Sequence, residues 1–210
     1  MNTNPQAKRI LCYGDSNTWG DVPNKEERYA SNIRWTGVLQ DALGDGYEVV
    51  EEGLGGRTFE AVESGKEHRV GITHLTSILK THEPIDIMTI MLGTNDMKSN
   101  FSLSVEDIAE HLKRTIQLVK EETPNTKIVV ISPPPVTNPD GRELDERLKD
   151  APEQSILLEP LYKEVAQEMD CLYLNAGEFI SLENTDGYHL AEEHHKLLGE
   201  KLAELLQNRF

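Results

Sequence analysis

The sequence predicts an α/β fold in which helices cover both faces of a parallel sheet. Five short apolar runs alternate with longer stretches of helical periodicity along the 210 residues. Two of these runs, 85–92 and 127–131, are continuous and rich in β-branched residues, which is typical of strands buried on both faces. Hydrophobic residues make up 37% of the chain and charged residues 28%, an ordinary composition for a folded globular protein.

Each apolar run is expected to form one strand, and most runs are followed by a glycine or a polar residue. Gly14, Gly53 and Gly93 follow the first three runs, and Ser132 with three prolines follows the fourth. Such residues favour a turn at the end of a strand. The expected strands cover residues 9–13, 47–51, 85–92, 127–131 and 171–175.

Helical spacing of apolar residues fills the stretches between the expected strands. The first helix is predicted over 33–43, where Ser31 and Asn32 are good capping residues. Apolar residues over 75–79 repeat at helical spacing just before the third strand. Both stretches separate consecutive strands, as a parallel sheet requires.

Three further helices are predicted in the second half of the chain. Ser104 and Asp107 form a capping box ahead of a long apolar stripe. A second stripe over 161–169 is entered near Pro160, a residue that suits a first helical turn. Leucines over 198–205 mark the last helix.

The chain is expected to form one domain over residues 1–210. No repeat, low-complexity segment or linker divides it, and its length suits one sizeable core. Two polar, proline-bearing segments, 21–31 and 133–152, are expected to be long loops. In this architecture such loops often shape the mouth of an active site.

The charge balance and the cysteine content bear on partners and compartment. Asp and Glu outnumber Lys and Arg by 37 to 21, for a net charge of −16, which argues against binding to nucleic acid or to anionic membranes. Cys12 and Cys171 do not make a disulfide framework. Residues 1–8 lack the apolar region of a signal peptide, and no apolar run reaches transmembrane length, so we expect a cytoplasmic protein.

Polar, glycine-rich segments follow the expected strands, and this predicts where the chemistry lies. In open parallel sheets, ligands bind beyond the carboxyl ends of the strands. Four segments should therefore meet at one edge of the sheet. They are residues 14–17, 53–58, 93–96 and 186–189.

These segments contain the residue types that acyl transfer requires. Ser16 lies at a tight turn after the first strand and is the candidate nucleophile, with His189 as general base. Asp186 precedes the histidine by three residues, so one local turn could hold the carboxylate against the ring. The backbone N–H groups of Ser16 and Gly56 and the side-chain amide of Asn95 are candidate donors to the oxyanion.

The segments also resemble the four sequence blocks of the SGNH (GDSL-type) hydrolases. Gly-Asp-Ser at 14–16, a glycine after the second strand, Gly-Thr-Asn-Asp at 93–96 and the late Asp186-x-x-His189 stand in the family order and span nearly the whole chain. Longer strings resemble the mycobacterial arylesterase/acyltransferase branch of that family. They lie at residues 10–16, 18–20, 34–39, 51–54 and 91–96.

The resemblance implies a role for each matching residue. Ser16 would be the nucleophile and an oxyanion donor, with Gly56 and Asn95 as the other two donors. His189 would be the base and Asp186 its orienting partner. Two residues are implied to contact the substrate. They are Trp19, in the acyl pocket, and Thr94.

The resemblance also implies a fold and a substrate class. The fold would be a three-layer α/β/α sandwich, flavodoxin-like, with a five-stranded parallel sheet. The substrate would be a small ester with a short acyl group, such as an acetylated sugar or metabolite, and the acyl group could also pass to an alcohol. No metal and no organic cofactor is implied, and the resemblance favours a homo-oligomer. Residues 140–154 are more charged here than in that branch, so acyl preference, transfer and oligomer size stay open.

Other interpretations of the same residues have to be weighed. His189, His194 and His195 with neighbouring acidic residues suggest a metal cluster, but the spacing is not that of a zinc motif. We expect His194 and His195 to lie on a solvated helix face. Residues 53–56 lack the full dinucleotide-binding pattern. Residues 16–18 could instead cradle a phosphate in a flavodoxin-like phosphate- or flavin-binding module without hydrolase activity. An inactive interaction protein is a third possibility.

Overall fold

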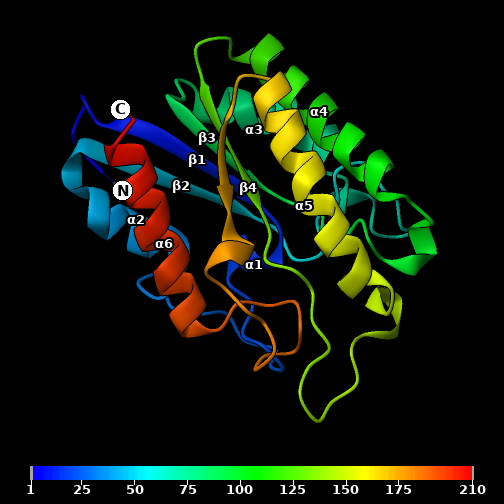
Figure 1. The fold of residues 1–210 in the computed structure, drawn as a ribbon. Coiled ribbons are helices and arrows are strands. Elements are labelled where there is room, and N and C mark those ends of the chain that lie inside the picture. The colour runs from blue at the N-terminus through cyan, green and yellow to red at the C-terminus, as the bar shows by residue number, and fades with distance from the viewer. Residues whose placement is uncertain (1, 210) are drawn as a thin grey trace.

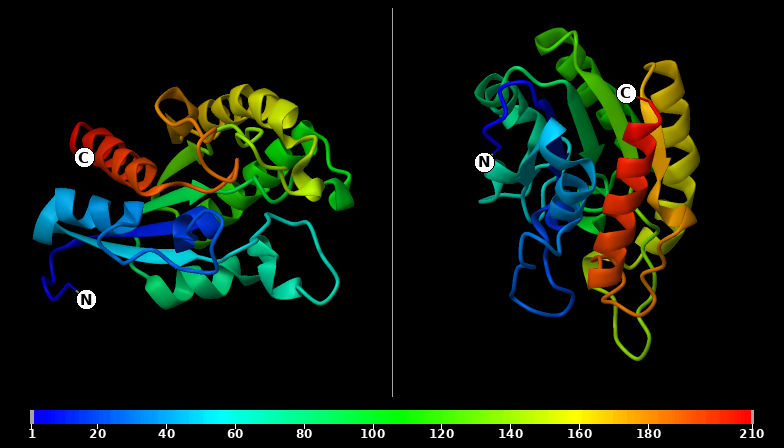
Figure 2. Two further views of the ribbon diagram at one scale, coloured as in Figure 1. Left: turned by 90° about the horizontal axis from the view of Figure 1, so that it is seen from below. Right: turned by 90° about the vertical axis from the view of Figure 1, so that its left-hand side faces the viewer.

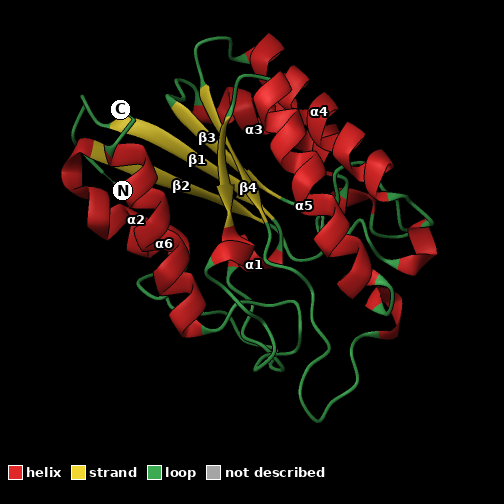
Figure 3. Ribbon diagram, viewed as in Figure 1, coloured by secondary structure: helices red, strands yellow, loops and turns green. Residues whose placement is uncertain are grey.

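The computed structural model describes residues 2–209 and contains, within them, one five-stranded sheet (Figures 1 and 3). All neighbouring strands run parallel, in the order β2-β1-β3-β4-β5, which confirms the predicted α/β class. Each strand overlaps one of the five expected runs. The strands are β1 (Lys8–Gly14), β2 (Tyr47–Gly53), β3 (Ile87–Met91), β4 (Lys127–Ser132) and β5 (Leu172–Asn175).

Helices lie on both faces of the sheet and complete the three layers (Figures 1 and 2). Helices α2 and α6 cover one face, and α3, α4 and α5 cover the other. The helices are α1 (Ser16–Trp19), α2 (Trp35–Leu43), α3 (Gly71–His82), α4 (Val105–Glu122), α5 (Ala151–Glu168) and α6 (Glu192–Gln207). No helix in the described part of the chain is both long and apolar enough to cross a membrane.

The apolar core is divided by the sheet into two clusters, as alternating strand side chains require. In β1, Leu11 and Tyr13 belong to the cluster under α3, α4 and α5, whereas Ile10 and Cys12 belong to the cluster under α2 and α6. All four side chains are at most 1% exposed. Burial on both faces explains why the central strands are continuously apolar in the sequence.

The strand register brings the carboxyl ends of the strands to one edge. Gly14 at the end of β1 pairs with Gly53 of β2 on one side and with Met91 of β3 on the other. Ser132 of β4 likewise pairs with Asn175 of β5. The long connecting loops gather at this edge, and the loop over 133–150 extends farthest from the sheet (Figure 1).

The cap predicted for the fourth helix is present. The Ser104 hydroxyl accepts from the backbone N–H of Asp107 at 3.1 Å, and the Asp107 carboxylate accepts from the backbone N–H of Ser104 at 2.9 Å. The cap predicted for the first long helix is wrong. Helix α2 begins at Trp35, after Arg34, without a side-chain cap, because Ser31 and Asn32 lie in the turn ahead of it.

The predicted entry of a helix near Pro160 is also wrong. Helix α5 begins at Ala151, has Pro152 in its first turn and contains Pro160 in its interior. A proline inside a helix removes one backbone donor, and the packing of a long amphipathic face overrides this local penalty. Leu158, Tyr162 and Val165 provide that face, since all three are buried in the core.

Candidate active site

Ser16 is the first residue of the short helix α1, which follows the interior strand β1 after the capping residue Asp15. The turn is stabilised by Asp15, whose carboxylate accepts from the backbone N–H of Asn17 at 3.0 Å. Asp15 is 2% exposed and Ser16 is 7% exposed. The local sequence Asp-Ser-Asn therefore caps a helix, as such sequences do, and presents the serine hydroxyl at the edge of the sheet.

His189 and Asp186 lie in the loop that precedes α6. His189 contacts Ser16, although the two residues are 173 positions apart in the sequence. The His189 Nε2 atom lies 3.0 Å from Ser16 Oγ, and Nδ1 lies 2.7 Å from Asp186 Oδ2. Asp186 also accepts from the backbone N–H of His189 at 2.9 Å. Burial by itself raises the pKa of Asp186, but the hydrogen bonds and charge of His189 outweigh it, so the net shift is downward.

The side chain of Asn17 links the serine helix to the histidine loop. Its Nδ2 atom donates to the carbonyl oxygen of Tyr188 at 2.9 Å, and its Oδ1 atom accepts from the backbone N–H of Leu190 at 2.9 Å. The residue between these two partners is His189. Asn17 is 3% exposed, so both hydrogen bonds form away from solvent. Sequence reasoning missed this role, because no local pattern pairs residues 171 and 173 positions apart.

The three candidate oxyanion donors belong to the segments that follow β1, β2 and β3, whose ends are neighbours in the sheet. Neither the Ser16 nor the Gly56 backbone N–H donates a hydrogen bond to another described residue, so both are available to a ligand. Gly56 has φ +77°, in the left-handed region that favours glycine, and the Arg69 side chain occupies the space that a β-carbon at this position would need. Asn95 follows Gly93 at the end of β3 and is 7% exposed.

The amide of Asn95 is oriented by contacts on both of its ends. Lys98 Nζ donates to Asn95 Oδ1 at 2.7 Å, and an ammonium can only donate, so the amide NH₂ must point the other way. That NH₂ lies 3.2 Å from the carbonyl oxygen of Arg57 and 3.3 Å from Asp15 Oδ2. These are long contacts, and one could yield to a stronger, charged acceptor. Burial, followed by the charge of Arg147, lowers the pKa of Lys98.

Two buried carboxyl groups support the loops of the site. Asp96 is fully buried and accepts from the backbone N–H of Phe59 at 3.0 Å. Burial raises the pKa of Asp15 to about 6 and that of Asp96 to about 8, and the charge of Asp15 adds to the second shift. Both carboxyl groups have a structural role, since each binds loop backbone.

Arg57 holds the ends of two strands together from beneath the site. Its Nη1 atom donates to the carbonyl oxygens of Gly14, at 2.8 Å, and of Glu52. Its guanidinium lies over the Tyr13 ring, 4.3 Å from the centroid. Arg57 is 6% exposed and satisfies backbone acceptors, so it stabilises the loop that carries Gly56.

A cavity of about 790 Å³ opens beside the histidine. Trp19, Tyr188 and His189 line it, together with acidic side chains that include Asp21. The structure thus brings Trp19 to the cavity at the candidate triad. Thr94 is 6% exposed and is not among the residues that line this cavity.

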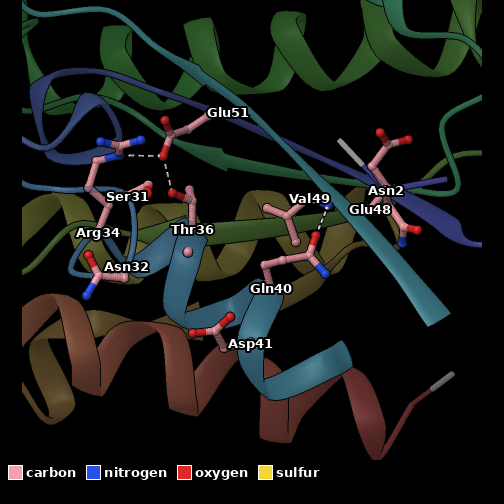
Figure 4. Close-up of a pocket in the computed structure, with 11 residues that line it drawn as sticks. Asn2, Ser31, Asn32, Arg34, Thr36, Gln40, Asp41, Glu48, Val49 and Glu51 are labelled. Atoms are coloured by element: carbon pink, nitrogen blue, oxygen red, sulfur yellow. Dashed lines mark hydrogen bonds and ion pairs between the residues drawn. The ribbon is translucent and has the colours of Figure 1, made fainter. Parts of the chain in front are cut away.

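A second cavity, of about 420 Å³, lies between α2 and β2 and contains none of the triad or donor residues (Figure 4). Its polar groups largely satisfy one another. Arg34 pairs with Glu51 at 2.8 Å, Thr36 also donates to Glu51, and Gln40 accepts from the backbone N–H of Val49 at 2.9 Å. These contacts tie α2 to β2, which is a structural role.

The geometry disfavours a phosphate cradle at residues 16–18. The backbone N–H groups of Asn17, Thr18 and Trp19 already donate to Asp15, through its side chain or its carbonyl oxygen. A phosphate-binding loop needs such groups to be free. The triad contacts have no counterpart in that interpretation.

The histidines of α6 do not lie together on a solvated face, so that expectation is wrong for His195. His195 is fully buried, and its Nδ1 atom accepts from the backbone N–H of Trp35 at 3.2 Å. Burial lowers its pKa to about 3. The Nδ1 atom of His194 accepts from the backbone N–H of Ala191 at 3.2 Å, at the start of the helix. Among residues 2–209, no group of three or more His, Cys, Asp or Glu side chains is arranged to hold a metal ion.

The charged segment 140–154 contributes little regular structure, with a short 3₁₀ turn before α5 begins. Within it, Arg147 forms a bidentate pair with Asp145, at 3.0 and 2.6 Å. Glu143 and Asp145 line the cavity beside His189. The segment therefore forms one wall of that cavity.

Comparison with known proteins places the chain among esterases. A sequence model of the GDSL-like Lipase/Acylhydrolase family matches residues 12–197. No curated protein sequence matches the chain.

Solved structures are similar over almost the whole chain. A carbohydrate acetylesterase from Sinorhizobium meliloti is 35% identical, with a TM-score of 0.91 over 97% of this chain and 100% of that one. An aryl esterase from M. smegmatis is 36% identical, with a TM-score of 0.90 over 97% and 100% of the two chains. A lipase/acylhydrolase from Enterococcus faecalis is 18% identical, with a TM-score of 0.70 over 96% of each chain, and shares the fold.

Proposed function

The chain belongs to the GDSL-like Lipase/Acylhydrolase family, which makes it a carboxylic ester hydrolase, and on that premise we propose that it is a serine esterase with Ser16 as nucleophile. One observation carries the proposal. The His189 ring bridges the other two groups, with Nε2 at 3.0 Å from Ser16 Oγ and Nδ1 at 2.7 Å from the Asp186 carboxylate. That is the arrangement in which a serine hydroxyl becomes nucleophilic.

The first half-reaction transfers the acyl group to the enzyme. His189 Nε2 takes the proton from Ser16 Oγ as that oxygen attacks the ester carbonyl. Asp186 holds the ring through Nδ1 and stabilises its positive charge. The tetrahedral oxyanion is stabilised by the N–H groups of Ser16 and Gly56 and by the amide of Asn95. His189 then returns the proton to the leaving alcohol.

The second half-reaction releases the acyl group. Water attacks the acyl-enzyme while His189 removes its proton, and the carboxylic acid leaves as Ser16 regains its proton. An alcohol in place of water gives a new ester, so the same site supports acyl transfer. These residue roles require no metal and no organic cofactor.

The substrate we propose is a small ester with a short acyl group, including acetyl esters of sugars or metabolites. Support comes from the carbohydrate acetylesterase and the aryl esterase to which the chain is similar at 35% and 36% identity. Trp19 lines the cavity beside His189 and is proposed to contact the substrate. Thr94, which is buried next to Asn95, is proposed as a second contact. The single domain, the cytoplasmic location and the homo-oligomeric state stay predictions.

Covalent labelling tests the proposal directly. A fluorophosphonate probe should modify Ser16, as mapped by mass spectrometry, and a short-chain ester should slow the labelling. The Ser16→Ala variant should neither label nor turn over 4-nitrophenyl acetate, while its circular dichroism matches wild type. Turnover by a folded Ser16→Ala variant would remove the nucleophile assignment.

A further inference from the structure

The carboxylate of Asp21 faces the Nε2 atom of His189, on the other side of the ring from Asp186. Its Oδ2 atom lies 3.8 Å from His189 Nε2, the same atom that contacts Ser16 Oγ. Asp186 contacts the other ring nitrogen, Nδ1. The position of Asp21 is therefore distinct from that of the triad carboxylate and has no part in the steps above.

The backbone, and not a side-chain bond, holds Asp21 in place. Its N–H donates to the carbonyl oxygen of Ser16 at 3.0 Å, and its backbone forms an antiparallel bridge with Arg28. The Arg28 guanidinium is committed elsewhere, to Glu51 at 2.8 Å and to the carbonyl oxygen of Trp19 at 2.7 Å. No described residue donates a hydrogen bond to the Asp21 carboxylate.

The Asp21 carboxylate is partly buried and accepts no hydrogen bond from a described residue, so it is available to a donor in the cavity. The Asp21 side chain is 30% exposed and faces the cavity beside His189. Burial raises its pKa, and the positive form of His189 opposes that shift. A group that occupies the space between Asp21 and His189 is therefore favoured when it can donate to the carboxylate.

The oxygen that attacks in the second half-reaction can lie in that space. Once Ser16 Oγ carries the acyl group, the attacking oxygen donates to Nε2, at the usual separation of about 2.8 Å. An oxygen at that distance from Nε2 can also lie within hydrogen-bond distance of a carboxylate oxygen 3.8 Å from the same nitrogen. Resting on the proposed serine esterase mechanism, we propose that Asp21 positions the nucleophile that resolves the acyl-enzyme and selects water over simple alcohols.

The selection of water over simple alcohols follows from the number of O–H groups that each nucleophile carries. Water has two O–H bonds, so one proton passes to His189 while the other hydrogen is donated to Asp21, and the carboxylate itself takes no proton. A simple alcohol has only one O–H, which His189 needs, and its alkyl group would face an unpaired carboxylate. A 1,2-diol has a neighbouring hydroxyl that can donate in place of the second hydrogen of water.

The same argument applies to the ester that is cleaved. The leaving alcohol of the first half-reaction occupies the place of the attacking water in the second. Esters whose alcohol carries a hydroxyl next to the esterified oxygen are therefore favoured over simple alkyl esters. Asp21 thus acts as a specificity-determining residue on the alcohol side of the reaction.

Acyl partitioning tests the inference. The protein turns over 4-nitrophenyl acetate in water that contains equal molar amounts of 1-propanol and 1,2-ethanediol, and acetate and both acetate esters are quantified. In the wild type, transfer to the diol should exceed transfer to propanol. Asp21→Ala should raise the ratio of propyl acetate to acetate about tenfold, the effect of one hydrogen bond to a charged group, and abolish the preference for the diol.

The controls separate this inference from the function on which it rests. Glu26→Ala removes another carboxylate from the same cavity and should leave the partition ratio unchanged. Asp21→Asn keeps the shape but removes the charge, must move the ratio in the same direction, and serves if the alanine variant does not fold. A wild-type protein without Ser16 labelling overturns the proposed function. A labelled, active wild type whose partition ratio is unaltered by both Asp21 variants overturns only the role of Asp21.

Discussion

The two hydrogen bonds of the Asn17 side chain give the sharpest test of how the site is held together. Asn17→Ala removes the donor to the Tyr188 carbonyl and the acceptor for the Leu190 N–H, both at 2.9 Å. The Asn17 side chain is 3% exposed, so little water can replace it as a hydrogen-bond partner. The variant therefore leaves both backbone groups unpaired. Each buried group left unpaired costs about 1–3 kcal/mol. The free energy of unfolding should therefore fall by about 2–6 kcal/mol.

The same change should affect catalysis more than binding. His189 lies between the two anchored residues, so its ring loses a fixed position relative to Ser16 Oγ. A misplacement of about 1 Å in a catalytic group costs on the order of 10²-fold in rate. We expect kcat for 4-nitrophenyl acetate to fall about 100-fold, with a smaller change in KM. Fluorophosphonate labelling of Ser16 should slow in parallel, because it depends on the same base.

Gln40→Ala is the matched control. The Gln40 amide also joins two backbone segments, since it donates to the carbonyl oxygen of Tyr47 and accepts from the N–H of Val49, both at 2.9 Å. It lies at the second cavity and contacts none of the triad residues. This variant should lose stability in urea denaturation but keep its kcat. If Asn17→Ala lost stability yet kept kcat within threefold of wild type, the positioning argument would be refuted.

The remaining predictions concern the oxyanion donors and the buried carboxyl groups. Asn95→Ala should lower kcat by about 10²–10³-fold if its amide binds the oxyanion, and a loss of only a few-fold would limit it to shaping the turn. Lys98→Met should lower kcat about tenfold, because Lys98 Nζ orients that amide by donating to Asn95 Oδ1 at 2.7 Å. An unchanged kcat would show that Asn95 does not depend on Lys98 for its orientation. Asp96 has a raised pKa of about 8, so the folded protein keeps a proton that the unfolded chain loses near pH 4. Stability should fall as pH rises from about 4 to 8 and then level off. Asp96→Asn should lack this component in urea titrations at pH 5 and pH 9, and an equal pH dependence in both proteins would contradict the assignment.

The placement of the triad follows from the topology of the sheet. Strand β1 lies between β2 and β3, and the segments that carry Gly56 and Asn95 follow these two neighbours. Helix α6 packs against α2 on one face, which brings the loop before α6 to the end of β1. A serine near the start of the chain and a histidine near its end therefore become neighbours.

The amino-acid sequence by itself determined the parallel α/β class, the five strands and the edge at which the polar loops meet. These features depend on local periodicity and on the rule that parallel strands end on one side, so no tertiary contact had to be known. The residues Ser16, Asp186 and His189 could be selected for the same reason. Their type and their position after strands already indicated acyl transfer.

Only the tertiary structure decided which side chains hold that site and which lie in the core. His195 is buried against Trp35 because α6 packs on α2, although its neighbours in sequence are polar. Pro160 continues a helix because the packing of α5 outweighs one missing backbone bond. Asn17 and Asp21 acquire their roles from contacts with the loop around His189, more than 160 positions away. Hydrogen bonds between such distant residues leave no periodic trace in a sequence, because the energy that selects them exists only after the chain has folded.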